Sequence, residues 1–292
     1  MNAVIYYLSI PFIYFISWLP FPVMYLISDL IHFILFRIIG YRKQVIITNL
    51  TNSFPEKNID EIQEISRKFN RYFCDLMLET LKTLTISRSS VKKCVEFEDD
   101  GLFEKFYNKN QSVVIVMGHL GNWELAGARF ALEKWHELYV IYHPLSNKYF
   151  DQLIYHMRTR LGNRLYAMNE TARGMIANRN NITATAFIAD QSPRPESAHW
   201  MTFLNQETPV FTGTSKLSQK LNYPIIYASV KLISRGKYAV KCELLTENPQ
   251  DLTEDQITEL HTKRLEADII EQPEIWLWSH RRWKHRRKEN IQ

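Results

Sequence analysis

Cysteine is scarce in this chain, and its arrangement argues against two kinds of stabilising site. The 292 residues include three cysteines, Cys74, Cys94 and Cys242, and no C-x-x-C pair. An odd number of widely spaced thiols predicts neither a disulfide framework nor a zinc site. The pattern fits a reducing compartment, and we expect all three side chains to lie in the core.

Most of the chain also lacks net charge. The total is +5, and six Lys or Arg against Glu289 lie between Arg281 and Gln292, so the other 280 residues sum to zero. The broad basic face expected of a nucleic-acid reader is missing, which argues against a nucleic-acid partner. The basic C-terminal tail, residues 279–292, instead suits anionic lipid, an acidic protein partner, or a solvated chain end.

Charged residues are missing from Met1 to Ser28, and apolar side chains dominate Asn2 to Leu19. A helix needs roughly 20 such residues to span a bilayer. A second apolar stretch, Phe21 to Gly40, follows Pro20. A signal peptide would need a basic start and a small-residue cleavage site, and neither is present.

We therefore predict a membrane anchor over residues 1–40 and a catalytic domain over residues 41–292. The anchor is either one spanning helix or an interfacial hairpin; the alternative is a helix pair packed on a soluble domain. Arg37, Arg42 and Lys43 follow the anchor, and such a basic cluster favours the cytoplasmic face for the next domain.

Beyond the anchor, apolar spacing predicts a long helix from Ile59 to Lys82, and then short apolar runs alternate with helical stretches. This alternation predicts an α/β fold with a mainly parallel sheet flanked by helices. Ser234-Arg235-Gly236 predicts a hairpin turn. The predicted strands are 113–117, 138–142, 183–189, 225–232 and 238–244, and the predicted later helices are 123–132, 148–161, 172–178, 214–221 and 253–270.

A glycine-flanked polar loop follows the strand 113–117 and leads into a helix. It carries His119, and Glu124 stands five residues later. Parallel sheets place active sites beyond the carboxyl ends of their strands. A carboxylate beside a histidine selects its tautomer and stabilises the imidazolium, so we predict His119 as general base and Glu124 as its partner.

The segment around His119 reads Gly118-His119-Leu120-Gly121-Asn122-Trp123-Glu124-Leu125-Ala126-Gly127. It resembles the signature of the lipid A biosynthesis late acyltransferases. These enzymes belong to the lysophospholipid acyltransferase superfamily, which has an H-x-x-x-x-D/E motif. Four further stretches resemble the family in the same order. They are Asn49-Leu50 with Ser53-Phe54-Pro55-Glu56, Arg158-Thr159-Arg160-Leu161-Gly162, Ala189-Asp190-Gln191, and Pro273-Glu274 with Trp276-Leu277-Trp278 and His280-Arg281-Arg282-Trp283-Lys284.

The resemblance implies a glycerolipid acyltransferase-like fold and transfer of a fatty acyl chain from acyl carrier protein or coenzyme A to a hydroxyl of a lipid A precursor or related glycolipid. No cofactor other than this acyl thioester, and no metal, is expected. The implied location is the cytoplasmic face of a bacterial inner membrane. The implied substrate-binding residues are Asn122, Arg158, Arg160, Asp190 and Gln191, and the arginines would bind phosphate.

Asp190 ends a buried strand and needs a partner there; we expect an arginine of the 158–160 stretch or an acceptor hydroxyl. The tail is expected to attract acyl carrier protein or the anionic leaflet, with Trp276, Trp278 and Trp283 at headgroup level.

Departures from the family pattern leave the acceptor open. His143 precedes Pro144 where the family usually has Arg, and Ser192-Pro193-Arg194-Pro195-Glu196 replaces a Gly-rich stretch. An aminoacyl lipid or a lysophospholipid is an alternative acceptor.

The same residues also fit a thioesterase in which His119 activates water, a catalytically inactive lipid-binding protein and, more distantly, a metalloenzyme. No G-x-S-x-G elbow occurs, which excludes the usual serine-hydrolase route.

Overall fold

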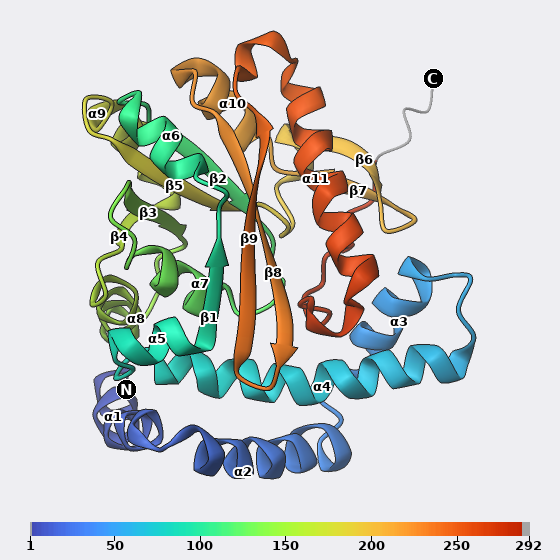
Figure 1. Ribbon diagram of the computed structural model, residues 1–292. Helices are drawn as coiled ribbons and strands as arrows, with labels where there is room; N and C mark the ends of the chain where they lie inside the picture. Colours follow the sequence, from blue (N-terminus) through green and yellow to red (C-terminus); the bar gives the residue numbers. More distant parts are fainter. Residues whose placement is uncertain (1, 288–292) are drawn as a thin grey trace.

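A seven-stranded sheet flanked by helices forms the centre of the protein (Figure 1). The computed structural model describes residues 2–287. Its strand order is β1-β9-β8-β2-β5-β3-β4. The strands are β1 Val95–Glu98, β2 Val113–Met117, β3 Glu137–Tyr142, β4 Arg164–Ala167, β5 Thr183–Ile188, β8 Ile225–Ser234 and β9 Lys237–Thr246. A separate hairpin consists of β6 His199–Phe203 and β7 Gln206–Val210.

The sheet is mainly parallel, as predicted. Strands β2, β3, β4, β5 and β8 run in one direction, whereas β9 is antiparallel to β8 and β1 is parallel to β9. Strand β2 lies between β5 and β8, and all five of its residues are buried. A continuous apolar run suits this place because both faces of the strand are covered. The carboxyl ends of β2 and β5 therefore meet at one edge of the sheet.

The helices connect the strands and extend beyond them. The helices are α1 Asn2–Trp18, α2 Phe21–His32, a π-helix Phe33–Ile38, α3 Lys43–Ser53, α4 Ile59–Lys82, α5 Arg88–Cys94, α6 Leu102–Asn108, α7 Trp123–Phe130, α8 Lys148–Thr159, α9 Thr171–Ala177, α10 Gly213–Leu221 and α11 Glu254–Glu271. Short 3-10 turns are η2 Met168–Glu170, η3 Pro195–Ser197, η4 Pro249–Asp251 and η5 Pro273–Ile275.

The predicted strands and helices are confirmed, with ends that differ by at most two residues. The hairpin turn is also confirmed: Arg235 and Gly236 join β8 to β9, and Gly236 has a φ of 75°. The short strands β1, β4, β6 and β7 and the helices α3, α5 and α6 were not predicted. The three cysteines are buried and free, as expected.

Helix α4 is the longest helix that the structure describes, and it begins and ends where the spacing predicts. Asn58 caps it by accepting hydrogen bonds from the backbone of Asp60 and Glu61, while the Glu61 side chain accepts from the Asn58 N–H. This capping box satisfies backbone donors that the first turn leaves free. The apolar stripe of the helix, including Ile62 and Phe69, is buried in the core.

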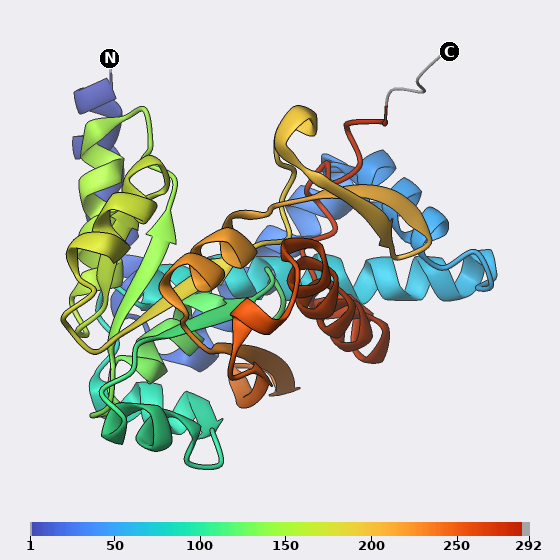
Figure 2. The same cartoon turned by 90° about the horizontal axis from the view of Figure 1, so that it is seen from above.

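The two N-terminal helices pack along α4 and α8. Figure 1 shows α1 and α2 along one side of the molecule, beside α4, and Figure 2 shows α1 alongside α8. Polar contacts join α2 to α4: the Ser28 hydroxyl donates to Asp75 over 2.6 Å, and the Tyr25 hydroxyl donates to Glu79 over 2.7 Å. Lys82 donates to the backbone oxygen of Ser17. The division of the chain at residue 40 stays a prediction.

The outward side of these helices is strongly apolar. Among residues 2–287, one helix, Phe21–Ile38, is long and apolar enough to cross a membrane by length and composition. Large apolar side chains of both α1 and α2 are exposed, including Phe12 at 71% and Leu26 at 69%. An exposed apolar surface of this kind marks an interaction site for a membrane or a protein, so the N-terminal helices could anchor the protein to a membrane.

Candidate active site

The loop between β2 and α7 is packed tightly between two parts of the fold, which explains its glycines. A Cβ at Gly118 would lie 2.6 Å from the Leu265 side chain, and one at Gly121 would lie 2.5 Å from Val230. Gly121 also has a φ of 63°, where side chains are disfavoured. The two glycines therefore seat the loop between α11 and β8, so that His119 projects at the carboxyl end of β2.

The carboxylate that contacts His119 is Asp190. Nδ1 of His119 lies 2.6 Å from Oδ1 of Asp190, and the backbone N–H of His119 donates to Oδ2 over 2.8 Å. The indole N–H of Trp276 donates to the same oxygen over 2.8 Å. Asp190 lies two residues beyond the end of β5, the neighbour of β2, and is 6% exposed.

Burial opposes ionisation of Asp190, but its pKa is nevertheless lowered to about 2. The charge of His119 and the hydrogen bonds from His119 and Trp276 outweigh the cost of burial. When Asp190 is ionised, the proton of the 2.6 Å contact lies on Nδ1 of His119, so Nε2 of the neutral ring is the nitrogen that can accept a proton. The amide nitrogen of Gln191 lies 3.2 Å from this Nε2.

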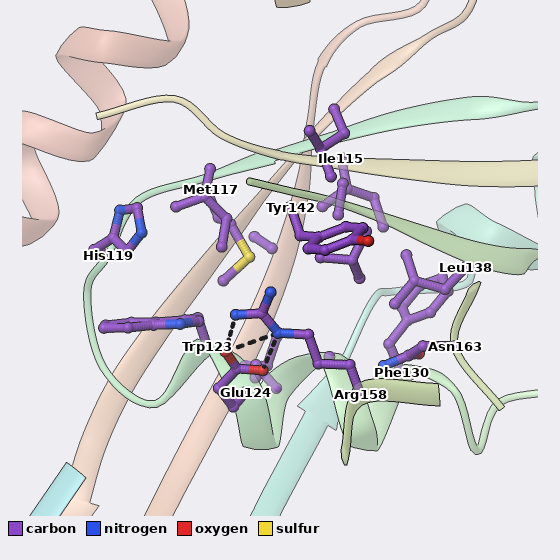
Figure 3. A pocket seen from close by; sticks show the side chains of 18 of the residues that line it. Ile115, Met117, His119, Trp123, Glu124, Phe130, Leu138, Tyr142, Arg158 and Asn163 are labelled. Atoms are coloured by element: carbon purple, nitrogen blue, oxygen red, sulfur yellow. Dashed lines mark hydrogen bonds and ion pairs between the residues drawn. The ribbon is translucent and has the colours of Figure 1, made fainter. Parts of the chain in front are cut away.

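Glu124 does not contact His119 in the structure, so the expected pairing of these two residues is corrected. Glu124 binds Arg158 of α8, whose Nε lies 3.0 and 3.1 Å from the two carboxylate oxygens, and Nη2 binds the same carboxylate. Figure 3 shows Glu124 turned to Arg158, with Trp123 beneath the His119 ring. The Trp123 ring packs edge-on against His119 with centroids 4.8 Å apart.

A cavity of about 370 Å³ begins at His119 and is lined mostly by apolar side chains. In Figure 3, His119 lies at one end of the lining, Phe130 and Leu138 lie at the other, and Arg158 lies between them. The lining includes residues of β1, β2, β3, β5, β8 and β9 and of α7 and α8. Such a shape suits a long apolar group whose reactive end is beside the histidine.

Two of the predicted substrate-binding residues, Arg158 and Gln191, line this cavity. Asn122 does not: it is fully buried, caps α7 by accepting from the Leu125 N–H over 2.9 Å, and donates to Glu79 over 2.8 Å. Its side chain is thus engaged by the protein, which argues against the predicted substrate contact.

Arg160 is also held by the protein. Its Nη1 donates to the backbone oxygens of Thr83 and Ile86 over 3.0 and 2.9 Å, so it ties α8 to the end of α4. Neither arginine of this stretch contacts Asp190, whose partners are His119 and Trp276, contrary to the expectation. Spacing alone did not distinguish Arg158, which faces the cavity, from Arg160, which does not.

The C-terminal segment folds over the site, while Arg281, Lys284, Arg286 and Arg287 of its basic patch stay exposed. Trp276 and Trp278 are buried at 3% and 0% exposure, and so is Arg282 at 1%, so these two tryptophans do not lie at headgroup level. Asn49 of α3 donates to the backbone oxygens of Trp278 and His280. Lys288 and the four residues after it lie outside the described residues.

Trp276 belongs to the site because it donates a hydrogen bond to Asp190. The family resemblance included Trp276, but its contact with Asp190 was not predicted from the sequence. The backbone N–H of Gly121 donates to the Ile275 oxygen over 3.1 Å, and Leu120 pairs with Trp276 in a β-bridge. These contacts connect the His119 loop to the C-terminal segment. Within residues 2–287, no three His, Cys, Asp or Glu side chains gather as a metal site would require.

The sequence matches the family described as bacterial lipid A biosynthesis acyltransferase over residues 1–285. It is 23% identical over 273 residues to a lipid A biosynthesis palmitoleoyltransferase of Escherichia coli (strain K12), a match that covers 92% of this chain and 87% of that protein. The same identity and coverage relate it to a lipid A biosynthesis acyltransferase of Shigella flexneri.

The family match, with this fold and site, makes the protein an α/β O-acyltransferase. The chain belongs to the bacterial lipid A biosynthesis acyltransferase family. Its histidine loop, its cavity and its folded C-terminal segment all lie within the matched residues 1–285.

Proposed function

We propose that the protein transfers a fatty acyl chain from an acyl thioester to a hydroxyl of a lipid A precursor or a related glycolipid, with His119 as general base and Asp190 as its supporting carboxylate. The observation that carries the proposal is the 2.6 Å contact between His119 and Asp190 at the end of the 370 Å³ apolar cavity. The acyl chain would occupy this cavity, where each buried methylene contributes about 0.8 kcal/mol.

The proposed reaction begins with the acceptor hydroxyl beside Nε2 of His119. His119 takes the hydroxyl proton while the oxygen attacks the thioester carbonyl, and Asp190 stabilises the imidazolium that forms. The tetrahedral intermediate then breaks its carbon–sulfur bond. The thiolate leaves with the proton from His119, so the base returns to its starting form and no cofactor beyond the thioester is consumed.

Arg158 is the cation of the cavity, and Glu124 holds it there. Burial lowers the pKa of Arg158, but the neighbouring charge of Glu124 outweighs this effect and raises the pKa. The guanidinium therefore stays charged and can bind a substrate oxygen. We assign Glu124 to positioning Arg158 and not to proton transfer.

The reaction would take place at a membrane surface. Helix α2 lies along α4 and makes buried polar bonds to it, such as Ser28 to Asp75, so we propose that α1 and α2 lie in the interface and do not span. The proposed donor, an acyl thioester of acyl carrier protein or coenzyme A, supports a catalytic domain on the cytoplasmic face.

The test of the function is acyl transfer by the purified full-length protein. The protein is incubated with acyl-acyl carrier protein or acyl-coenzyme A and a lipid A precursor, and the lipid product is followed by mass spectrometry. His119→Ala should lower turnover about 10² to 10⁴-fold, because a positioned base contributes that much. Turnover above a tenth of wild type would refute the base role, and acyl release without transfer would favour a thioesterase.

Membrane binding has a separate test on the exposed apolar face. Phe12→Asp with Leu26→Asp should release the protein from liposomes of bacterial lipid in a flotation assay, because both side chains are largely exposed and a charge there opposes insertion. Since neither change removes packing, the melting temperature should stay within about 2 °C of wild type. Unchanged flotation would place the anchor elsewhere.

A further inference from the structure

A second, much smaller cavity lies beside Asp190, the carboxylate that contacts His119. Its volume is about 10 Å³, and Asp190, His261 and Arg282 are among the residues that line it. Arg282 comes from the C-terminal segment and His261 from α11. These two side chains are 1% and 3% exposed.

Several polar atoms of this cavity have no partner in the described part of the chain. They are Nε2 of His261 and both Nε and Nη1 of Arg282. The one hydrogen bond of the Arg282 guanidinium runs from Nη2 to the backbone oxygen of Pro209 over 2.7 Å. A buried charge with free donors is costly, so these atoms need a ligand.

The other polar groups in the lining are already engaged. The Tyr227 hydroxyl donates to Asp268 over 2.8 Å, and the Thr262 hydroxyl donates to the Thr258 oxygen over 2.7 Å. Asp190 accepts three hydrogen bonds, two from His119 and one from Trp276. A carboxylate offers about four acceptor sites, so one site of Asp190 is left.

A single water molecule matches this arrangement in size and in chemistry. A buried water needs roughly 10 to 15 Å³ and two to four polar partners. We propose that Arg282 and His261 hold one water in this cavity, that the water donates a hydrogen bond to Asp190, and that Arg282 is thereby a positioning residue for the His119–Asp190 pair.

The charges agree with this assignment. Burial lowers the pKa of Arg282 to about 10, partly offset by the charge of Asp190, so the guanidinium is cationic at neutral pH. Burial lowers the pKa of His261 to about 4, so its ring is neutral and Nε2 can either donate to the water or accept from it. Arg282 thus acts on Asp190 through the water.

The site itself is tested by a crystal structure of the full-length protein at a resolution that shows ordered water, with a second crystal soaked in bromide. The expected result is water density within hydrogen-bond distance of Arg282, His261 and Asp190, and no anomalous peak. A dry cavity, a guanidinium placed directly on Asp190, or a bromide peak would each overturn the assignment. This test does not depend on activity.

The positioning role is tested by kinetics and rests on the proposed acyl transfer. His261→Phe fills the cavity and Arg282→Met removes the cation. Each should lower kcat about tenfold, the effect of losing one hydrogen bond to a charged group, with the KM of both substrates unchanged. Arg282→Lys keeps a charged donor and should recover kcat to within about threefold of wild type.

Ile269→Val is the matched control, since Ile269 is a fully buried residue of α11 outside this cavity. It should lower the melting temperature without lowering kcat. If His261→Phe behaves in the same way as this control, the cavity is structural and the positioning role fails. If His119→Ala keeps its activity while the water is seen, the proposed function fails and the water site stands.

Discussion

Two carboxylates beside the catalytic loop, Asp190 and Glu124, have partners of different kinds. Asp190 binds the imidazole of His119, a group that can act as a general base. Glu124 binds the guanidinium of Arg158, which stays protonated. The first pair can therefore take part in proton transfer, whereas the second is a permanent pair of charges that holds a cation in the cavity.

The pairs also differ in how they are supported. Asp190 accepts hydrogen bonds from a loop backbone, a histidine ring and an indole, all from segments distant in sequence. Glu124 and Arg158 bind each other across two helices, α7 and α8. Changes at the two carboxylates should consequently affect different properties of the enzyme.

The largest difference is expected in turnover. Asp190→Asn leaves the shape of the site but removes the charge that stabilises the His119 imidazolium, so kcat should fall about 10² to 10⁴-fold. Glu124→Gln should cost about tenfold or less, because it only loosens Arg158. Both are measured by mass spectrometry of the lipid product. Equal losses in the two variants would remove the distinction drawn between the pairs.

The second difference is expected in stability. Glu124→Gln leaves the Arg158 guanidinium, which is 23% exposed, without its anion. A double-mutant cycle with Arg158→Met, measured by urea unfolding, should give a coupling free energy of about 1 to 3 kcal/mol. The matched control is Glu64 with Arg67, an exposed pair on α4 at 45% and 58% exposure. Its cycle should give about 0.5 kcal/mol or less, and comparable couplings would contradict the assignment.

A third difference is expected at acid pH and concerns Asp190. Its pKa is lowered from 3.8 to about 2 in the folded state, so the unfolded chain binds more protons between these values. Stability from this group is therefore present above pH 3.8 and is lost as the pH falls through about 2.

This loss amounts to about 2 kcal/mol of unfolding free energy. Urea unfolding at a series of acid pH values should show wild type losing more stability than Asp190→Asn as the pH falls. Parallel curves for the two proteins would mean that the folded-state pKa of Asp190 is not depressed.

The elements that the sequence predicted well are those whose signal is local. The span of α4 follows from apolar spacing and from the Asn58 cap, and β2 follows from five consecutive apolar residues. The hairpin β6–β7 was not predicted because its turn, Leu204-Asn205, contains no glycine, although both residues have a positive φ. The edge strands β1 and β4 have four residues each, too few to show a clear pattern.

The candidate site was predicted only in part for a related reason. His119 stands at the end of a strand that the sequence identified, and a carboxylate partner was expected from chemistry. The nearest carboxylate in the sequence is Glu124, but α7 turns it to Arg158. Asp190 is 71 residues from His119 and reaches it because β5 pairs with β2.

By itself, therefore, the sequence determined the strand ends that carry His119 and Asp190, the long helix α4, the apolar N-terminus and the resemblance to the acyltransferase family. Each of these depends on neighbouring residues or on a motif. The strand order decided which carboxylate meets His119, and long-range packing buried Trp276 and Arg282 behind it. Those outcomes depend on contacts between distant segments, whose pairing apolar periodicity does not encode.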